Sequence, residues 1–325
     1  MSERTERTYR NWIIRYVNFC GRRHPRECGT REVRGFLDHL AQAHQVAART
    51  QNQALAAIQY LYRQVLESPL ADIPPYARGK RGDRVPEVLE PDEVARVFAL
   101  LEGTPLLIAQ LLYGTGLRLS EALSLRAKDL SLSRHYLFVR DGKGGKDRRT
   151  VLPTSLVPRL VAQIAHVRRQ HAMDLAKGGA GAYLPGALSR KYPGVVRDWR
   201  WAWLFPSHRY VRDRDRGLRL RWHVHPSTMQ RALAVAARAA GVNRRVTPHI
   251  FRHSFATQLL RSGYDIRKVQ SLLGHRDVST TMLYLHVLET GVGVRSPLDQ
   301  LGDGAAGGGG TVAVVPSSLA RLSGR

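Results

Sequence analysis

Six basic or phenolic side chains between residues 118 and 284 have the types that phosphate chemistry requires. They are two arginines, a lysine, two histidines and a tyrosine: Arg118, Lys143, His249, Arg252, His275 and Tyr284. Two arginines that face one site can clamp the non-bridging oxygens of a phosphate and stabilise the charge of a transition state. A tyrosine becomes a nucleophile once it loses a proton with a pKa of about 10, which requires a base and cationic surroundings. Together these groups could break a phosphodiester bond without a metal.

Each of these residues also has an ordinary structural explanation. Arg118 could lie on a helix surface, Lys143 could solvate a turn, and a tyrosine such as Tyr284 usually packs in a core. The combination favours chemistry, because His249 and Arg252 lie three residues apart on a predicted helix and so share a face. Lys143 lies in the turn "DGKGGKD", from which its amine could protonate a leaving oxygen.

No acidic cluster and no His or Cys ligand spacing surrounds these six residues, which argues against metal-assisted phosphoryl transfer. We therefore expect neither a metal nor a cofactor. The two cysteines, Cys20 and Cys28, are too few for a disulfide framework, and we interpret them as small buried residues in a helical region.

The chain carries a strong positive charge. Its 325 residues include 51 Lys plus Arg against 26 Asp plus Glu, which gives a net charge of +25. An Arg-rich genome would explain why arginine replaces lysine, but not why bases exceed acids. Such a charge attracts polyanions, and counterion release from phosphates makes nucleic acid the expected partner. No run of 18 apolar residues occurs and the N-terminus "MSERTERTYRNW" is polar, so we expect a cytoplasmic protein with no membrane partner.

The first 67 residues predict a small all-helical domain. Apolar residues recur at helical spacing in three segments, with Gly21 as a stop and Thr30 as a cap. Residues 68–89 contain four prolines and predict a linker, because proline blocks helical and ladder hydrogen bonds. We expect basic residues of this linker to contact DNA: Arg78, Lys80 and Arg81.

A second domain is predicted for residues 90–301. Residues 90–93 form an acidic first helical turn, a helix lies near 105–130, and short strands flank the Gly-rich turn. Further helices are predicted at 154–176, 226–240, 249–262, 265–273 and 279–289, with Gly274 ending one of them. The stretch 183–225 is aromatic and basic without a clear period, and the low-complexity tail 302–325 is expected to be disordered. The predicted fold class is mainly α with two domains: an all-α domain, then a mostly helical α/β domain with a small antiparallel β-sheet.

Four motifs carry a resemblance to a known family. They are "GTGLRLSE", "GKGGK", "PHxxRHSFAT" and "LLGHxDVSTTMxY". Their order resembles the tyrosine recombinases, also called phage-type integrases, over roughly residues 5–298. The resemblance implies a bacterial, nucleoid-associated enzyme whose N-terminal domain is a SAM-like core-binding domain. It also implies a transesterase, with chemistry like that of type IB topoisomerases, which leaves a 3′-phosphotyrosyl bond on Tyr284 and a free 5′-hydroxyl.

The resemblance also implies a role for each residue. Arg118 and Arg252 would hold the scissile phosphate, and His275 would hydrogen-bond it. Lys143 would be the general acid, with Lys146 of the same loop as the alternative. His249 would assist proton movement at the nucleophile Tyr284, and Glu121 would orient an arginine or a histidine.

The stretch 183–225 resembles the insertion of integron integrases, which insert and excise gene cassettes. Those enzymes recognise folded single-stranded hairpins by their extrahelical bases, so the resemblance places Trp201 and His223 among base-contacting residues. Trp222 stands in "RWH" where relatives often have "RHH", and "YLHV" stands where they have "YTHV". Tryptophan stacks on bases and donates through one indole N–H, so Trp222 is also a candidate base contact. A local core beneath the insertion would explain the same tryptophans.

The resemblance further implies a tetramer on two DNA sites, double-stranded attachment sites and folded cassette hairpins, with residues 287–301 docking on a neighbouring protomer. Two alternatives remain. A phage-type or Xer-type recombinase would act on ordinary duplex sites and would not need residues 183–225. A non-catalytic DNA-binding protein would use "SGYDIRKVQSLLGHRDVSTTMLY" as a reader similar to a helix-turn-helix.

Overall fold

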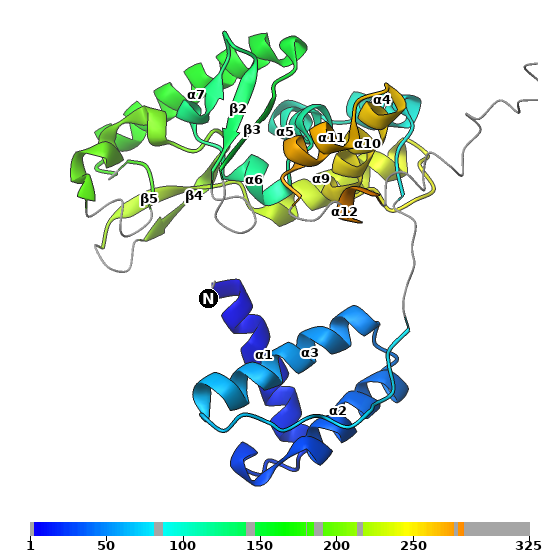
Figure 1. Ribbon diagram of the computed structural model, residues 1–325. Coiled ribbons are helices and arrows are strands. Elements are labelled where there is room, and N and C mark those ends of the chain that lie inside the picture. Colours follow the sequence, from blue (N-terminus) through cyan, green and yellow to red (C-terminus); the bar gives the residue numbers. More distant parts are fainter. Residues whose placement is uncertain are drawn as a thin grey trace, which may run out of the picture. The chain divides into compact units, whose positions relative to one another are not determined.

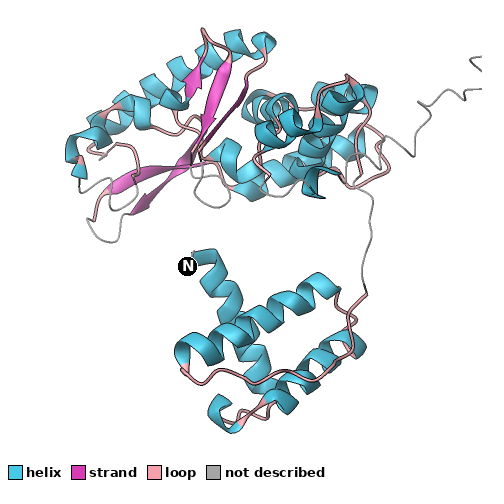
Figure 2. Cartoon of the chain, viewed as in Figure 1, coloured by secondary structure: helices cyan, strands magenta, loops and turns pink. Residues whose placement is uncertain are grey.

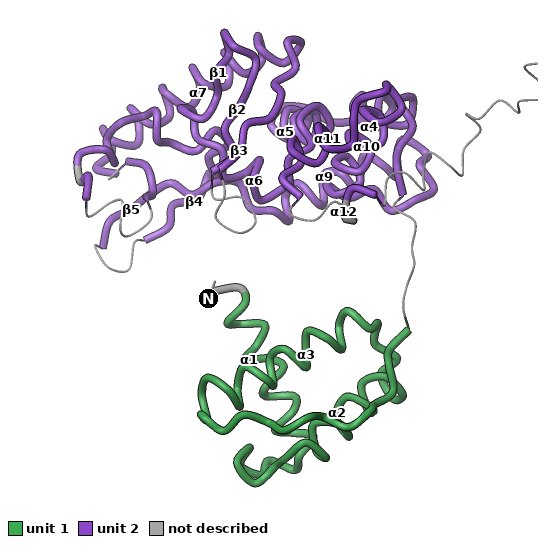
Figure 3. The backbone as a smooth tube through the Cα atoms, viewed as in Figure 1, with its two compact units in different colours: residues 1–84 green, residues 85–325 purple. Residues whose placement is uncertain are grey.

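The computed structural model describes residues 3–80, 87–140, 147–179, 181–184, 191–212, 217–275 and 279–282. The chain divides into two compact units, Met1–Arg84 and Val85–Arg325 (Figure 3). The described parts of both units are mainly helical, and the second contains two small antiparallel sheets (Figure 2). The predicted fold class is confirmed, with one sheet more than the sequence indicated.

The first unit is a cluster of helices around an aromatic core. Its helices are α1 (Glu3–Phe19), the 3-10 turn Pro25–Glu27, α2 (Thr30–Gln42) and α3 (Ala48–Tyr60), which continues as a π-helical turn over Leu61–Val65. The ring of Tyr16 lies edge-on to Phe36 and to Tyr62, with centroid distances of 5.6 and 6.4 Å. The hydroxyls of Tyr16 and Tyr62 are 3.0 Å apart, and that of Tyr62 also donates to the carbonyl of Cys28. The core therefore buries two tyrosines whose hydroxyls are both hydrogen-bonded.

Two local predictions for this unit need correction. Thr30 is the first residue of α2 and not its cap; Gly29 precedes the helix, and its N–H donates to Oε2 of Glu32 at 2.7 Å. Cys20 and Cys28 are both buried, as predicted, but neither lies in a helix. Burial raises the pKa of the Cys20 thiol to about 11, so the thiol is protonated at neutral pH.

Residues 69–80 lie against the helices of the first unit as an irregular segment, which we call the strap. Nε2 of the fully buried Gln51 donates to the carbonyls of Leu37 and Ala77 at 3.0 and 2.7 Å. The Gln51 Oε1 accepts from the N–H of Gly79 at 3.0 Å. A Cβ atom on Gly79 would come within 2.3 Å of a backbone carbonyl oxygen, so the strap approaches the unit closely at this point. This part of the predicted linker is thus held to the helices of the first unit by side-chain hydrogen bonds.

The second unit contains most of the helices and all the strands that the structure describes (Figure 1). The helices are α4 (Pro91–Ala99), α5 (Gly103–Thr115), α6 (Leu119–Leu123), α7 (Val157–Ala176), α9 (Pro226–Ala239), α10 (Pro248–Arg261), α11 (Ile266–Leu273) and α12 (Ser279–Met282). The strands are β1 (Leu130–Ser131), β2 (Tyr136–Val139), β3 (Arg148–Val151), β4 (Pro206–Arg212) and β5 (Arg219–His223). Strands β1, β2 and β3 form an antiparallel sheet in that order, and β4 pairs with β5.

Helices α5 and α10 form the centre of the second unit's core. Helix α5 is apolar around its circumference, and its buried Leu107, Ile108, Leu111 and Leu112 pack in one cluster with the fully buried Phe251 of α10. Figure 1 shows α9, α10 and α11 gathered with α5 on one side of the three-stranded sheet. The segment before α4 joins this core, because the N–H of the buried Leu89 donates to Oγ of Ser254 in α10 at 2.8 Å.

A glycine divides the helix that the sequence predicts near 105–130. Gly116 follows α5 with φ of 67°, in the left-handed region that residues with a Cβ rarely adopt. A Cβ at this position would lie 2.4 Å from the ring of Phe255 in α10. The chain turns here and starts α6 with Arg118 at its N-cap. The turn thereby places Arg118 and Glu121 within one helical turn of each other.

The stretch 183–225 contains the 3-10 turns Pro193–Arg197 and Trp199–Trp201 and then the β4–β5 hairpin. The hairpin is attached to α7 through Asp174, which forms an ion pair with Arg221 and accepts a 2.8 Å hydrogen bond from the hydroxyl of Tyr210. Burial alone would raise the pKa of Asp174, but the hydrogen bonds from Arg221 and Tyr210 lower it. The anchored hairpin gives the described part of this stretch a regular structure that the sequence pattern did not indicate.

Candidate functional site

Glu121 lies at the centre of a cluster of three arginines. Its carboxylate accepts from Nη1 of Arg118 at 2.7 Å and from the N–H of the same residue at 2.8 Å. Arg148 of β3 donates to both oxygens, from Nη1 at 3.0 Å and from Nη2 at 2.7 Å. Nη1 of Arg252 lies 3.8 Å from Oε2. One carboxylate from α6 thus gathers guanidinium groups from α6, β3 and α10.

This arrangement holds Glu121 in its ionised form. The side chain is only 6% exposed, and burial by itself would raise its pKa. The hydrogen bonds and positive charge of Arg148, followed by the bonds from Arg118, outweigh burial and lower the pKa to about 2. The carboxylate therefore stays charged and keeps the guanidinium groups together, which would otherwise repel one another.

Arg252 is held in place by backbone oxygens. Its side chain is 1% exposed, and it donates from Nη1 to the carbonyl of Gly116 and from Nη2 to that of Leu273, both at 2.6 Å. These bonds tie α10 to the end of α5 and to the end of α11. The guanidinium is therefore fixed before any phosphate arrives.

His275 follows the last turn of α11. Gly274 ends this helix with φ of 65°, as predicted, and the N–H of His275 donates to the carbonyl of Gln270. Nδ1 of His275 is hydrogen-bonded to Oγ1 of the buried Thr281 at 2.9 Å. Burial, and then the charges of Arg252 and Arg118, lower the pKa of His275 to about 3, so the imidazole is neutral at pH 7.

His249 and His253 lie one turn apart on α10. Their rings meet edge to face with centroids 4.6 Å apart, and His249 is the exposed member of the pair. Burial, and then the neighbouring imidazole of His249 and the charge of Arg252, lower the pKa of His253 to about 4. His253 thus has a perturbed pKa inside a basic cluster, which is a feature of functional sites.

The structure brings together several of the residues singled out in the sequence and leaves others outside its described part. Arg118, Glu121, Arg252 and His275 converge around one point, whereas Lys143, Lys146, Tyr284 and Arg81 lie outside the described residues. Arg78 is exposed on the strap, stacks on Tyr76 and donates to Oδ1 of Asn52, and Lys80 is exposed beside it. Arg148 and His253 were missed: Arg148 follows the Gly-rich turn, and His253 stands beside Arg252 in "RHSFAT".

Aromatic side chains gather in and around the β4–β5 hairpin. Nζ of Lys128 lies 2.7 Å from the ring centroid of Trp201, and burial, with Arg140 nearby, lowers the pKa of this lysine to about 8. Trp203 is buried, while Trp222 is half-buried and lies edge-on to it at 5.5 Å. The local-core interpretation therefore fits Trp203, and Trp201 and Trp222 keep part of their surface exposed.

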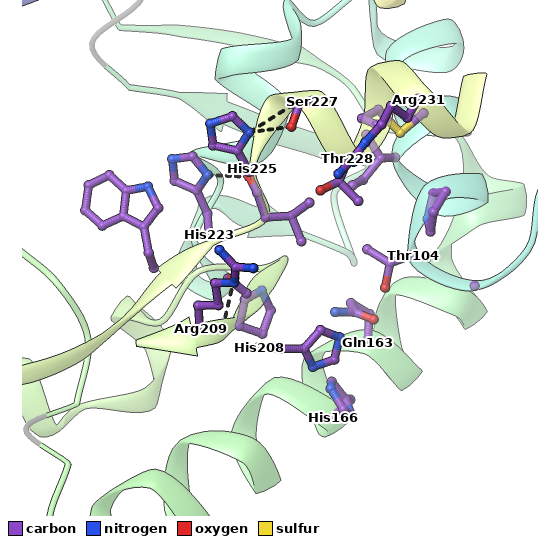
Figure 4. A pocket seen from close by; sticks show the side chains of 18 of the residues that line it. Thr104, Gln163, His166, His208, Arg209, His223, His225, Ser227, Thr228 and Arg231 are labelled. Atoms are coloured by element: carbon purple, nitrogen blue, oxygen red, sulfur yellow. Dashed lines mark hydrogen bonds between the residues drawn. The ribbon is translucent and has the colours of Figure 1, made fainter. Parts of the chain in front are cut away.

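Trp222 and His223 line a pocket of about 910 Å³ between the hairpin and α5, α7 and α9 (Figure 4). Figure 4 shows His166, His208, His223 and His225 around it, with Arg209 beside them. Nδ1 of His223 is hydrogen-bonded to the carbonyl of Val224 at 2.7 Å, which fixes the ring. Aromatic and imidazole surfaces around a pocket of this size can accept a flat heterocycle.

The described residues include no group of three or more His, Cys, Asp and Glu that could bind a metal. Within the same part of the chain, none of the helices is long and apolar enough to cross a membrane.

Comparison with known proteins gives consistent matches over nearly the whole chain. The model of the phage integrase family matches residues 87–290, and that of the phage integrase N-terminal SAM-like domain matches residues 1–72. An Escherichia coli protein named integrase/recombinase is 49% identical over 301 residues, which cover 92% of this chain and 89% of that protein. Tyrosine recombinase XerD of Agrobacterium fabrum is 31% identical over 87% of this chain and 84% of its own length.

Solved structures share the fold at low sequence identity. The Tn1549 transposon integrase in complex with transposon right end DNA superimposes with a TM-score of 0.63 at 14% identity, over 94% of this chain and 93% of that one. The XerH site-specific recombinase bound to palindromic difH substrate gives 0.58 at 16% identity, over 91% and 78% of the two chains.

Proposed function

Because this chain belongs to the phage integrase family of tyrosine recombinases, we propose that it is a site-specific DNA recombinase with Tyr284 as its nucleophile. The observation that carries the proposal is the convergence of Arg118, Arg252 and neutral His275 beside the ionised Glu121. Three donors from separate elements then meet where one phosphate could bind. The similarity to tyrosine recombinase XerD, and to solved structures bound to transposon right end DNA and to difH substrate, supports DNA as the substrate.

Each side chain has one part in the proposed reaction. Arg118 and Arg252 bind the non-bridging oxygens and stabilise the negative charge of the transition state, in which phosphorus is pentacoordinate. His275 is neutral, so it donates a hydrogen bond to the phosphate without adding a charge. The oxygen of Tyr284 forms a bond to phosphorus as the bond to the 5′ oxygen breaks. The tyrosine proton leaves towards His249, and Lys143 protonates the 5′ oxygen; Lys146 is the alternative acid.

Within the family, we assign the chain to enzymes that insert and excise gene cassettes, as integron integrases do. The support is the anchored β4–β5 hairpin with its aromatic pocket, in which Trp222 and His223 could receive an extrahelical base. Trp201, with Lys128 over its ring, offers a second stacking surface beside a charge that attracts phosphate. A tetramer on two DNA sites, held by residues 287–301, would complete the assembly; that segment lies outside the described residues.

A recombinase acting on ordinary duplex sites is the second candidate. It is favoured by the XerD proteins of Agrobacterium fabrum and Caulobacter vibrioides, which are 31% and 36% identical to this chain. Comparison of folded single-stranded hairpins with the same sequence as duplex separates the two candidates. Preferred use of the hairpin supports the cassette enzyme, and equal or better use of the duplex supports the second candidate.

A suicide substrate nicked near the cleavage point tests catalysis itself. The wild-type chain should form a covalent DNA adduct, and Tyr284→Phe should form none while still binding DNA. If the wild-type chain forms no adduct, or if the adduct persists in Tyr284→Phe, the chain is a non-catalytic DNA-binding protein or uses another nucleophile.

A further inference from the structure

Arg148 contacts two parts of the candidate site that are distant from it in sequence. Its guanidinium binds both oxygens of Glu121 in α6, and its Nε donates to the carbonyl of Leu272 in α11 at 3.0 Å. Its own strand, β3, begins two residues after Lys146 in the sequence. The side chain is 11% exposed, so these bonds form in a largely dry environment where their strength is least reduced by water.

The end of α11 is shaped to accept this arginine. A Cβ atom on Gly274 would lie 2.8 Å from Cδ of Arg148 and 3.1 Å from its Nε. Only a glycine leaves room there for the arginine to reach the carbonyl of Leu272. The next residue is His275, so the position of the imidazole depends on the same contact.

Resting on the proposed recombinase function, we propose that Arg148 is a positioning residue, which holds Glu121 against Arg118 and fixes the end of α11 that carries His275. It does so through a bidentate ion pair and one backbone hydrogen bond, without contacting DNA. The three nitrogens of its guanidinium are each already hydrogen-bonded to the protein. A lysine could not reproduce this fork, because an ammonium group is compact and bonds from a single atom.

The role of Arg148 predicts a loss of catalysis without an equal loss of DNA binding. In single-turnover cleavage of a suicide substrate at saturating protein, Arg148→Met should slow adduct formation by about 100-fold, as expected when catalytic groups move by about an ångström. Arg148→Lys keeps the charge and should still lose about tenfold or more. The affinity for the uncleaved site should change by less than about threefold in both variants.

Arg149 provides the matched control. It is the next residue of β3, it is exposed, and its guanidinium packs over the rings of Tyr136 and Phe138 at 5.2 and 4.9 Å. Arg149→Met removes the same charge from the same strand without touching Glu121 or α11. Its cleavage rate at saturating protein should stay within about threefold of wild type.

Two measurements distinguish action through Glu121 from a general effect on the structure. They are the coupling between Arg148 and Glu121 and the pH dependence of cleavage. If Arg148 acts through Glu121, the double variant with Glu121→Gln should be no slower than the slower single variant. Arg148 makes the largest interactions that lower the pKa of Glu121, so this pKa should rise in Arg148→Met and cleavage by the variant should slow further as pH is lowered. That additional slowing should vanish in the double variant. Thermal unfolding of each full-length variant confirms that it is folded, and Arg148→Lys gives the same tests if Arg148→Met unfolds.

The outcomes separate this inference from the proposed function. If the wild-type chain forms an adduct and Arg148→Met and Arg148→Lys do so within about threefold of its rate, the inference is overturned and the recombinase stands. Losses that multiply in the double variant would likewise overturn action through Glu121. Absence of an adduct with the wild-type chain overturns the proposed function and this inference together.

Discussion

Nδ1 of His275, just after α11, lies 2.9 Å from Oγ1 of Thr281 in α12. Thr281 is fully buried, so its hydroxyl fixes the orientation of the imidazole from inside the protein. We predict that Thr281→Val, which keeps the shape but removes the hydroxyl, slows single-turnover cleavage about tenfold, equivalent to about 1.4 kcal/mol.

Thr281→Ser is the control, because it retains the hydroxyl at the same position. It should cleave within about threefold of wild type, and DNA affinity should be unchanged in both variants. A wild-type rate in Thr281→Val would show that this hydrogen bond does not orient His275.

The second unit should lose stability in mild acid. Burial and neighbouring positive charges lower the pKa of His275 to about 3 and that of His253 to about 4, whereas both regain about 6.5 when the chain unfolds. Between these values the unfolded chain binds protons that the folded chain does not. The contribution of the two histidines to the free energy of unfolding is therefore complete above about pH 6.5. As pH falls below this value, the free energy of unfolding decreases by about 1.4 kcal/mol per pH unit for each proton.

Urea unfolding followed by tryptophan fluorescence measures this loss. Trp12 is the one tryptophan of the first unit, and Trp12→Phe leaves four that all report on the second unit. In that background, His253→Gln should reduce the dependence of unfolding free energy on pH between about 6.5 and 5. An unchanged slope would contradict the predicted burial of His253 as a neutral ring.

The end of α11 shows what sequence patterns can and cannot provide here. Gly274 was predicted to end a helix because glycine tolerates the left-handed conformation, and its φ of 65° agrees. Arg148 was not predicted, since nothing in "KDRRTV" distinguishes an arginine that faces a buried carboxylate from its exposed neighbour Arg149. The direction of a side chain on a four-residue strand depends on the register of pairing, which is a tertiary property.

The strap is a second case in which the sequence predicts only part of the structure. Its prolines correctly indicate that residues 69–80 lack helix and strand. They do not indicate where the segment lies, because its position depends on Gln51, a single polar residue in an ordinary helical pattern. Similarly, the motifs indicated Arg118 and Arg252. That three arginines meet at Glu121 could be seen only in the folded structure.

Removing the Gln51 amide should release the strap. Gln51→Met leaves buried backbone groups of Leu37, Ala77 and Gly79 without their partner, which should cost about 2 to 3 kcal/mol in the first unit. Trypsin should then cleave after Arg78 and Lys80 much faster than in wild type. Gln42→Met changes an exposed glutamine of α2 and should leave the cleavage rate unaltered. If trypsin cleaves Gln51→Met as slowly as Gln42→Met, other contacts hold the strap.

Trp222 should affect substrate choice more than catalysis. Its ring lines the pocket beside His223, so Trp222→Ala should lower use of a folded hairpin about tenfold relative to the same sequence as duplex, the size expected for one lost base stack. Trp199 packs near Arg168 outside this pocket, and Trp199→Ala should leave the ratio unchanged. An equal loss on both substrates in Trp222→Ala would indicate a packing role only.

Alanine substitutions at two glycines distinguish the effect of backbone strain from the effect of displacing Arg148. Gly263 and Gly274 follow consecutive helices with φ of 81° and 65°, so alanine at either position should cost about 1 kcal/mol or slightly more in stability. A Cβ on Gly263 meets nothing within 4 Å, whereas one on Gly274 would lie 2.8 Å from Cδ of Arg148. Gly274→Ala should therefore slow cleavage by about tenfold or more, while Gly263→Ala cleaves at nearly the wild-type rate. Equal cleavage by the two alanine variants at saturating protein would show that the active geometry tolerates displacement of Arg148.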